Sequence, residues 1–209
     1  RFPGKPLVPL LGIPMIQRVY QNMAEAFSEV AVVTDDQRIE DQVLSFGGKV
    51  IRVDDDVPSG SERVAIAARN NFPKADYIVN VQGDEPLLDG AAVKKLLDFH
   101  KSSPHFDITT LLRERKDSSA NENTVKAAFA VETGECLYFS RSPIPFGNGV
   151  WHQHIGVYCY KASALQKFVG LSPSRLEQRE KLEQLRALEG QMKIGAIMTD
   201  LDLIGVDTP

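Results

Sequence analysis

An acidic turn follows an apolar strand near the middle of the chain. Residues 77–81 are rich in aromatic and β-branched side chains, as in a buried strand, and Gln82-Gly83-Asp84-Glu85-Pro86 follows at once. Gly83 permits a sharp turn, and Pro86 disfavours helical geometry at Glu85. Open α/β sheets bind ligands beyond the C-terminal ends of their strands, so Asp84 and Glu85 are candidate ligand-binding residues. A strand-to-helix turn with a capping aspartate explains the same residues.

A second acid and two cations could share chemistry with Asp84. Asp207 follows an apolar stretch and lies in a turn between a glycine and a proline, which is the setting of Asp84. Arg1 and Lys5 flank a Pro-Gly pair at the start of the sequence. Such a loop can present backbone N–H groups and a lysine to phosphate. A solvated basic loop is the alternative interpretation.

Ser59 and Glu62 have the spacing of a capping box. This motif predicts a helix over residues 61–70. The exposed N–H groups at the start of that helix could also contact a polar or anionic ligand, together with Ser59. Capping alone is sufficient to explain the two residues.

Four further polar residues are candidates only in combination. Arg141 lies in the proline-punctuated stretch 139–145, and His154 lies at the start of a strand expected over residues 155–160. Glu183 and Gln184 belong to the longest helical pattern, which runs from residue 174 to about 189. A lone arginine is usually solvated, a lone histidine is usually a surface or core residue, and a charged helix face usually meets water. Residue type alone therefore assigns none of them to a site.

The elements that must position these residues alternate in type. Helices are predicted over residues 14–26, 38–46, 61–70 and 91–99, and strands over 29–34, 49–53, 77–81 and 108–112. Short connections between alternating strands and helices predict an α/β fold with a mostly parallel central sheet flanked by helices. Strands at 125–131, 136–140 and 155–160 are separated by turns, so residues 125–160 are expected to form a smaller mixed or antiparallel lobe. A last strand is predicted over residues 193–197.

Composition limits the classes of function. The 209 residues are 43% hydrophobic and 25% charged, which suits one domain with a smaller lobe. A net charge of −4 argues against broad binding to nucleic acid or anionic membranes. Cys136 and Cys159 are too few for a disulfide framework or a cysteine zinc site, so a cytoplasmic location is expected. No apolar run approaches membrane-spanning length, and no signal peptide is visible.

Taken together, the motifs resemble one enzyme family. Arg-Phe-Pro-Gly-Lys-Pro-Leu, Ser-Gly-Ser-Glu-Arg, Val-Gln-Gly-Asp-Glu-Pro and Gly-Val-Asp-Thr-Pro occur in the order seen in cytidylyltransferases. The chain is most similar to the 3-deoxy-manno-octulosonate (Kdo) cytidylyltransferases, whose pattern also includes Phe-Ser-Arg-Ser-Pro-Ile-Pro, His-Ile-Gly-Val-Tyr and Leu-Glu-Gln-Leu-Arg. The resemblance covers nearly the whole chain. It implies the nucleotidyltransferase fold, which is Rossmann-like and related to glycosyltransferase A, as a single domain over residues 1–209.

The resemblance also implies roles for the candidate residues. Asp84 and Asp207 are expected to bind Mg²⁺, with Lys5 as a third catalytic residue. CTP is expected to contact Arg1, Lys5, Ser59, Arg63 and Gln82. The resemblance assigns the carboxylate of Kdo to Arg141 and its hydroxyl groups to His154, Glu183 and Gln184.

The implied reaction joins CTP and Kdo into CMP-Kdo and pyrophosphate, for bacterial lipopolysaccharide or capsule synthesis. Both substrates are small molecules, and the family leads us to expect a homodimer. Family members carry a strand and a basic, serine-containing loop before the Arg-Phe-Pro-Gly-Lys stretch, so we expect the first half of this motif to precede Arg1. The connection from Pro145 to His154 is short for the family. Transfer to another acidic sugar such as sialic acid, and an inactive nucleotide-sugar-binding homologue, are the alternatives.

Overall fold

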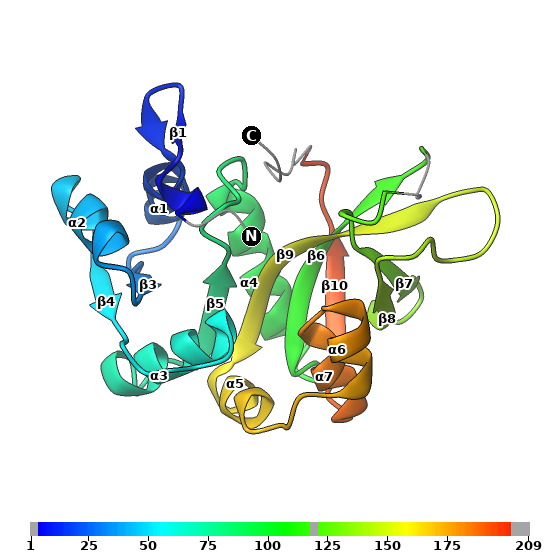
Figure 1. The fold of residues 1–209 in the computed structure, drawn as a ribbon. Helices are drawn as coiled ribbons and strands as arrows, with labels where there is room; N and C mark the ends of the chain where they lie inside the picture. The colour runs from blue at the N-terminus through cyan, green and yellow to red at the C-terminus, as the bar shows by residue number, and fades with distance from the viewer. Residues whose placement is uncertain (1–3, 118–120, 202–209) are drawn as a thin grey trace. The chain divides into compact units, whose positions relative to one another are not determined.

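Two units make up the chain, and the structure, a computed structural model, describes residues 4–117 and 121–201. Unit 1 comprises residues 1–75, 81–94 and 202–209. Unit 2 comprises residues 76–80 and 95–201. Figure 1 shows the elements of both units, with unit 1 in blue and cyan for most of its length.

Unit 1 places its helices as the hydrophobic spacing predicts. Its elements are η1 (Lys5–Leu7), β1 (Pro9–Leu10), β2 (Ile13–Pro14), α1 (Met15–Ala24), β3 (Val32–Thr34), α2 (Gln37–Ser45), β4 (Val50–Arg52), α3 (Gly60–Asn71) and the first turns of α4 (Gly90–Ser102). Helix α1 buries Met15, Ile16, Val19 and Met23, which recur at helical spacing. Strands β3 and β4 pair in parallel, with Val32 opposite Val50, as expected for strands joined through a helix.

Unit 2 is built on a six-stranded sheet in the order β5-β9-β6-β10-β8-β7. Its elements are β5 (Tyr77–Val81), the rest of α4, β6 (Ile108–Arg115), β7 (Lys126–Ala130), β8 (Glu135–Ser140), β9 (Trp151–Lys161), α5 (Ala162–Val169), α6 (Arg175–Glu180), α7 (Gln184–Glu189) and β10 (Ile194–Met198). The strands lie side by side in Figure 1, from β5 in green to β7 in yellow-green.

The fold class is the predicted α/β, but the six-stranded sheet is mixed. Strand β10 runs parallel to β6, while β9 is antiparallel to β6, and β8 is antiparallel to both β7 and β10. The expected mostly parallel sheet is therefore wrong for this unit. The turn-linked strands β7, β8 and β9 pair in antiparallel fashion, as expected, and are part of the six-stranded sheet. Strand β9 pairs directly between β5 and β6.

The expected long helix over residues 174–189 is two short helices. Helix α6 begins with the capping box of Ser174 and Glu177 and ends at Lys181, which has a left-handed conformation at φ 55°. The backbone N–H of Leu182 donates to Glu177 O at 3.2 Å, which closes the end of α6. The leucine spacing runs across this break and hides it, although only α7 buries its apolar residues, whereas α6 buries none. Helix α5 was not predicted.

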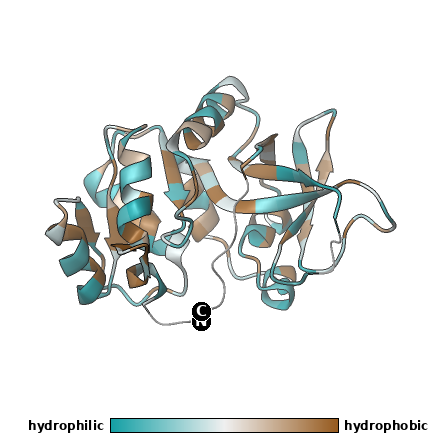
Figure 2. Ribbon diagram, turned by 90° about the horizontal axis from the view of Figure 1, so that it is seen from above, coloured by the Kyte–Doolittle hydropathy of each residue, from teal (hydrophilic) through white to brown (hydrophobic). Residues whose placement is uncertain are grey.

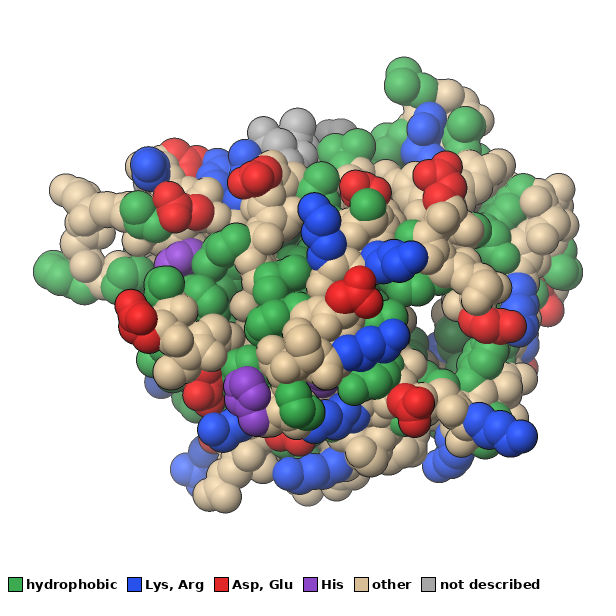
Figure 3. Space-filling view, turned by 180° about the vertical axis from the view of Figure 1, so that it is seen from behind, with side chains coloured by type: hydrophobic (Ala, Val, Ile, Leu, Met, Phe, Trp, Pro, Cys, Tyr) green, Lys and Arg blue, Asp and Glu red, His purple; other side chains and the backbone are tan. Residues whose placement is uncertain are grey.

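The core of unit 2 lies on the sheet. Leu111, Val157, Leu165 and Leu185 are fully buried, and they come from two strands and from α5 and α7. Figure 2 shows hydrophobic stretches along the strands and both kinds of residue on the helices. On the face in Figure 3, acidic and basic side chains are interspersed, in keeping with the small net charge of −4. Across residues 4–117 and 121–201, no helix has the length and apolar character needed to cross a bilayer.

Candidate active site

The acidic turn carries an ion pair within unit 1. Lys5 Nζ, from η1, lies 2.8 Å from Asp84 Oδ2, just after β5. The two side chains are 22% and 34% exposed, so the pair is accessible to a ligand. A Cβ on Gly83 would lie 3.2 Å from Ile16 Cδ1, so glycine lets the turn approach α1 closely. Two residues predicted to act together, Lys5 and Asp84, are therefore brought together.

Asn22 holds the loop that follows Asp84. Its Nδ2 donates to Pro86 O and to Leu88 O, both at 3.1 Å, from the side of α1. The start of α4 lies against the same residue, because a Cβ on Gly90 would lie 2.3 Å from Asn22 O. Sequence analysis missed Asn22. In the sequence, Asn22 is marked only as a polar residue next to Met23, which belongs to the buried face of α1.

Replacing Gly90 with alanine is expected to destabilise unit 1. The new methyl group would overlap Asn22 O and force α1 and α4 apart, at a cost of about 1–3 kcal/mol in the free energy of unfolding. Gly60→Ala is the matched control, since Gly60 is also helical and nothing lies within 4 Å of a Cβ there. Urea denaturation measures both. Equal stability of the two variants would contradict the close approach.

The other residues of unit 1 that were predicted to contact the nucleotide differ in their hydrogen bonds and in their exposure. Ser59 Oγ accepts from Glu62 N at 3.3 Å and caps α3, as predicted. Arg63 donates to Val53 O and pairs with Asp35 Oδ2 at 2.7 Å. Its guanidinium is only 15% exposed and ties together the loops after β3 and β4. Gln82 is exposed in the acidic turn. Arg1 and Asp207 lie outside the described residues.

In unit 2, Arg141 is held by neutral acceptors. Its Nε donates to Glu180 O at 3.0 Å and its Nη1 donates to Glu122 O at 3.1 Å. The carboxylate of Glu180 instead accepts from Ser140 Oγ and from Arg141 N, at 2.8 and 2.9 Å. Within the described ranges, the Arg141 guanidinium forms no ion pair with a carboxylate. A fixed guanidinium that keeps its full charge is suited to bind a carboxylate ligand.

His154 is buried and neutral in unit 2. It lies inside β9, not at the start of a strand as predicted, because β9 begins earlier, at Trp151. Burial lowers the pKa of His154 to about 3. Thr110 Oγ1 donates to Val157 O at 2.7 Å, so it accepts from His154 Nε2 at 3.0 Å. The imidazole thus carries its proton on Nε2 and keeps Nδ1 as an acceptor.

The lowered pKa of His154 predicts acid lability. The unfolded chain binds a proton at this histidine near pH 6.5, whereas the folded chain does not until about pH 3. The stabilisation is complete above pH 6.5 and is lost as the pH falls. Urea denaturation between pH 7 and 4.5 should show a falling free energy of unfolding, with a shallower slope for His154→Gln. His100 and His152, whose pKa values are also lowered by burial, act in the same direction in both proteins.

Gln184 has an unused donor at the start of α7. The residue is 6% exposed, and its Nε2 finds no hydrogen-bond partner among residues 4–117 and 121–201. An unsatisfied buried amide is costly, which makes it a mark of a ligand site. Glu183 precedes it, and its Oε1 lies 3.9 Å from Arg186 Nη2.

Arg186 fixes the position of α7. Its Nε and Nη2 donate to the Glu177 carboxylate at 2.9 and 2.7 Å, and its guanidinium lies 5.3 Å from the ring centroid of Phe168. Only 4% of the side chain is exposed. The charged residues of this segment were expected on the surface, but Arg186 and Glu177 form an ion pair that is largely buried. This ion pair fixes the position of α7, and with it the positions of Glu183 and Gln184 at the start of that helix.

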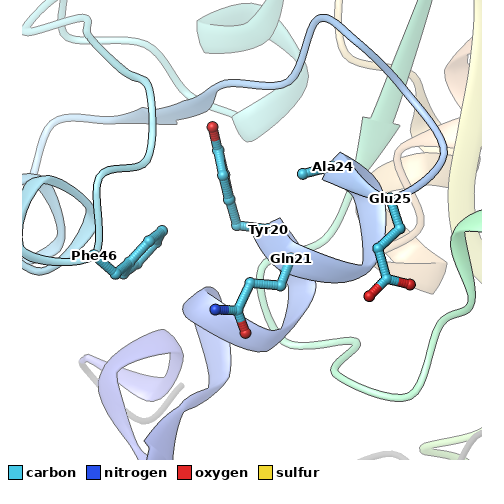
Figure 4. Close-up of a pocket in the computed structure, with 5 residues that line it drawn as sticks. All are labelled: Tyr20, Gln21, Ala24, Glu25 and Phe46. Atoms are coloured by element: carbon cyan, nitrogen blue, oxygen red, sulfur yellow. The ribbon is translucent and has the colours of Figure 1, made fainter.

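Two surface hollows are lined by other residues. In unit 1, the first hollow is lined by Tyr20, Gln21 and Ala24 of α1, by Glu25 just after it and by Phe46, which follows α2 (Figure 4). In unit 2, residues of the 143–151 loop line the second hollow together with Lys116 and Asp117. None of the predicted site residues contributes to either lining.

Comparison with known proteins decides the family. The cytidylyltransferase family model matches residues 1–194. The chain belongs to the cytidylyltransferase family. Members of this family are nucleotidyltransferases, and the chain is such an enzyme. The chain is 43% identical to the 3-deoxy-manno-octulosonate cytidylyltransferase of Thermodesulfovibrio yellowstonii, covering 100% of this chain and 89% of that protein.

Other cytidylyltransferases show the same extent of match. The 8-amino-3,8-dideoxy-manno-octulosonate cytidylyltransferase of Shewanella halifaxensis is 41% identical over 100% of this chain and 89% of its own length. Among solved structures, a CMP:2-keto-3-deoxy-manno-octonic acid synthetase in complex with CTP has a TM-score of 0.91 and 37% identity, covering 100% of this chain and 88% of that one. A cytidylyltransferase from Leptospira borgpetersenii, at 16% identity and a TM-score of 0.63, shares the fold.

Proposed function

We propose that this cytidylyltransferase transfers CMP from CTP to Kdo, releasing pyrophosphate. The 2-hydroxyl oxygen of the sugar forms a bond to the α-phosphorus, the bond from that phosphorus to the bridging oxygen breaks, and the hydroxyl proton is lost to solvent. The names of the similar enzymes and the CTP complex of the similar structure support this reaction. The alternatives, transfer to sialic acid and an inactive homologue, are not favoured.

The observation that carries the proposal is the state of Arg141. Neutral carbonyls orient its guanidinium at 3.0 and 3.1 Å, which leaves its charge available. An acidic sugar brings the carboxylate that a planar, bidentate donor recognises. A neutral sugar would leave this cation without a counter-charge.

Gln184 and His154 complete the recognition of the sugar. Gln184 Nε2 is a buried donor that needs an acceptor. His154 Nε2 bonds to Thr110, which leaves Nδ1 as the acceptor. A sugar hydroxyl can satisfy either group. Glu183, fixed beside Gln184 through Arg186, accepts a further hydroxyl proton in a hydrogen bond. Because His154 stays neutral, it orients the sugar without changing charge at physiological pH.

Lys5 and Asp84 serve the nucleotide. Lys5 neutralises charge on the triphosphate, with Arg1 as its predicted companion, because phosphoryl-type transfer depends mainly on positioning and electrostatics. Ser59 and Gln82 contact the cytidine. Arg63, whose guanidinium already joins Asp35 and Val53 O, keeps the nucleotide side of unit 1 in place.

The residues present fit Mg²⁺ with few protein ligands. Asp84 is partly exposed, and Lys5 engages only its Oδ2. Among residues 4–117 and 121–201 there is no group of three metal-binding side chains. Mg²⁺ commonly takes one or two carboxylates and completes its shell with water and phosphate oxygens, so Asp84 with Asp207 would suffice. The bound ion would neutralise phosphate charge and lower the pKa of the attacking hydroxyl.

Acceptor profiling with CTP tests the proposal. The full chain is incubated with CTP, Mg²⁺ and Kdo, 8-amino-3,8-dideoxy-manno-octulosonate or N-acetylneuraminate, and release of pyrophosphate is measured. Kdo is expected to give the highest kcat/KM. A preference for the amino sugar would reassign the acceptor, and no turnover with any acid would refute the activity. Omitting Mg²⁺ should abolish turnover.

We also propose a setting for the enzyme. CMP-Kdo made in the cytoplasm supplies lipopolysaccharide or capsule synthesis, and the enzyme acts as a homodimer. Membership of the cytidylyltransferase family supports these statements. Sedimentation of the purified protein tests the dimer.

A further inference from the structure

A second cation lies behind Arg141 in unit 2. Lys126, at the start of β7, is fully buried. Its Nζ donates to Asn121 O and to Arg141 O, both at 2.6 Å. Lys126 thus binds the backbone of the residue whose guanidinium is proposed to meet the sugar carboxylate.

The charge of Lys126 is not matched by a carboxylate. Within the described ranges it forms no ion pair, and both of its acceptors are neutral carbonyls. Burial lowers the pKa of Lys126, and Arg141 lowers it further, while the carboxylates of Glu122 and Glu180 act in the opposite direction. A buried ammonium held only by carbonyl groups is expensive, so its position next to Arg141 needs a physical reason.

Two acids, Glu122 and Glu180, belong to the electrostatic surroundings of Lys126. The carboxylate of Glu180 is occupied by Ser140 Oγ and Arg141 N. Glu122 contributes its backbone carbonyl to Arg141 Nη1. Two cations, Lys126 and Arg141, therefore share one region with the carboxylates of Glu122 and Glu180, neither of which forms a salt bridge with them. In the part of the chain that the structure describes, the Arg141 guanidinium thus has no carboxylate bound to it and can pair with that of an anionic ligand.

We propose that Lys126 is a positioning residue for the carboxylate site: it fixes Arg141 through Asn121 O and Arg141 O, and its buried charge strengthens selection of an acidic sugar. This inference rests on the proposed function, since Arg141 is the residue that meets the acid. Lys126 itself does not touch the sugar. Its field acts through protein, where charges are less screened than in water.

The test compares the acid with a neutral analogue. For the full chain with CTP and Mg²⁺, kcat/KM is measured with Kdo and with its C1 carboxamide, and the ratio is the acid preference. Lys126→Met should lower this preference about tenfold and leave the KM for CTP unchanged. Lys126→Arg should restore most of the preference. Lys167→Met, which removes the same charge from an exposed position on α5, is the matched control.

The outcomes separate this inference from the proposed function. If wild-type enzyme does not turn over Kdo, the proposed function fails and the inference with it. If wild type is active but Lys126→Met keeps its acid preference, or loses rate equally with acid and carboxamide, Lys126 has only a structural role. Lys126→Gln keeps a donor without the charge, and it takes the place of the methionine variant if that variant does not fold.

Discussion

Asp84→Asn is expected to lower kcat with CTP and Kdo by about 1,000-fold, because the amide cannot hold a divalent cation against the phosphates. The pair with Lys5 is partly exposed and contributes little to folding, so the free energy of unfolding should change by less than about 1 kcal/mol. Single-turnover kinetics and calorimetric titration with CTP, each with and without Mg²⁺, measure the effect. The Mg²⁺ dependence of CTP binding should disappear in the variant.

Glu85→Gln is the control for that experiment. It removes one negative charge from the adjacent position of the same turn, where no role in the reaction is assigned. Its kcat should stay within a few-fold of wild type. If both variants lose activity to the same degree, the net charge of the turn matters and Asp84 is not a specific ligand.

Arg141→Ala is expected to reduce kcat/KM for Kdo about 100-fold, while the KM for CTP stays near its wild-type value. Loss of a charge-assisted, bidentate partner for a carboxylate typically costs a few kcal/mol. Arg141→Lys should recover only part of the loss, since lysine cannot reproduce the planar fork that binds a carboxylate at two points. Steady-state kinetics with each substrate varied in turn separates the two affinities.

Arg175→Ala is the matched control for Arg141. Arg175 is exposed in the first turn of α6, so its removal changes the net charge equally without touching the Glu180 contacts. Its kinetics should equal those of wild type. A rise in the KM for CTP with Arg141→Ala, equal to the rise for Kdo, would show that Arg141 supports folding and not sugar binding.

Local sequence signals predicted much of the fold. Strand β5 has the predicted bounds, and Ser59 caps α3 where the capping box placed it. These elements depend on short-range chemistry that a single sequence displays. The mixed sheet was not predictable in this way, because the choice of β9 as neighbour of both β5 and β6 depends on pairing between distant segments.

The candidate site likewise contains residues that the sequence predicted and residues that it did not. Lys5 and Asp84 were predicted to belong to one site, for the triphosphate and for Mg²⁺, and their side chains lie 2.8 Å apart. Asn22 and Lys126 were missed because both donate to backbone carbonyl groups, and a carbonyl has no sequence signature. The break at Lys181 was missed for a related reason, because a lysine gives no indication in the sequence that its backbone is left-handed.

The position of β10 has a consequence for how the chain folds during synthesis. This strand is near the end of the described sequence, yet it occupies the middle of the sheet of unit 2, between β6 and β8. Ile194 pairs with Ile108, so the ladder joins segments separated by most of the unit. Until residue 198 has emerged from the ribosome, β10 cannot form, and the edges of β6 and β8 that it pairs with stay unpaired. We expect unit 2 to acquire protease resistance late and slowly, as proteins dominated by distant pairings do.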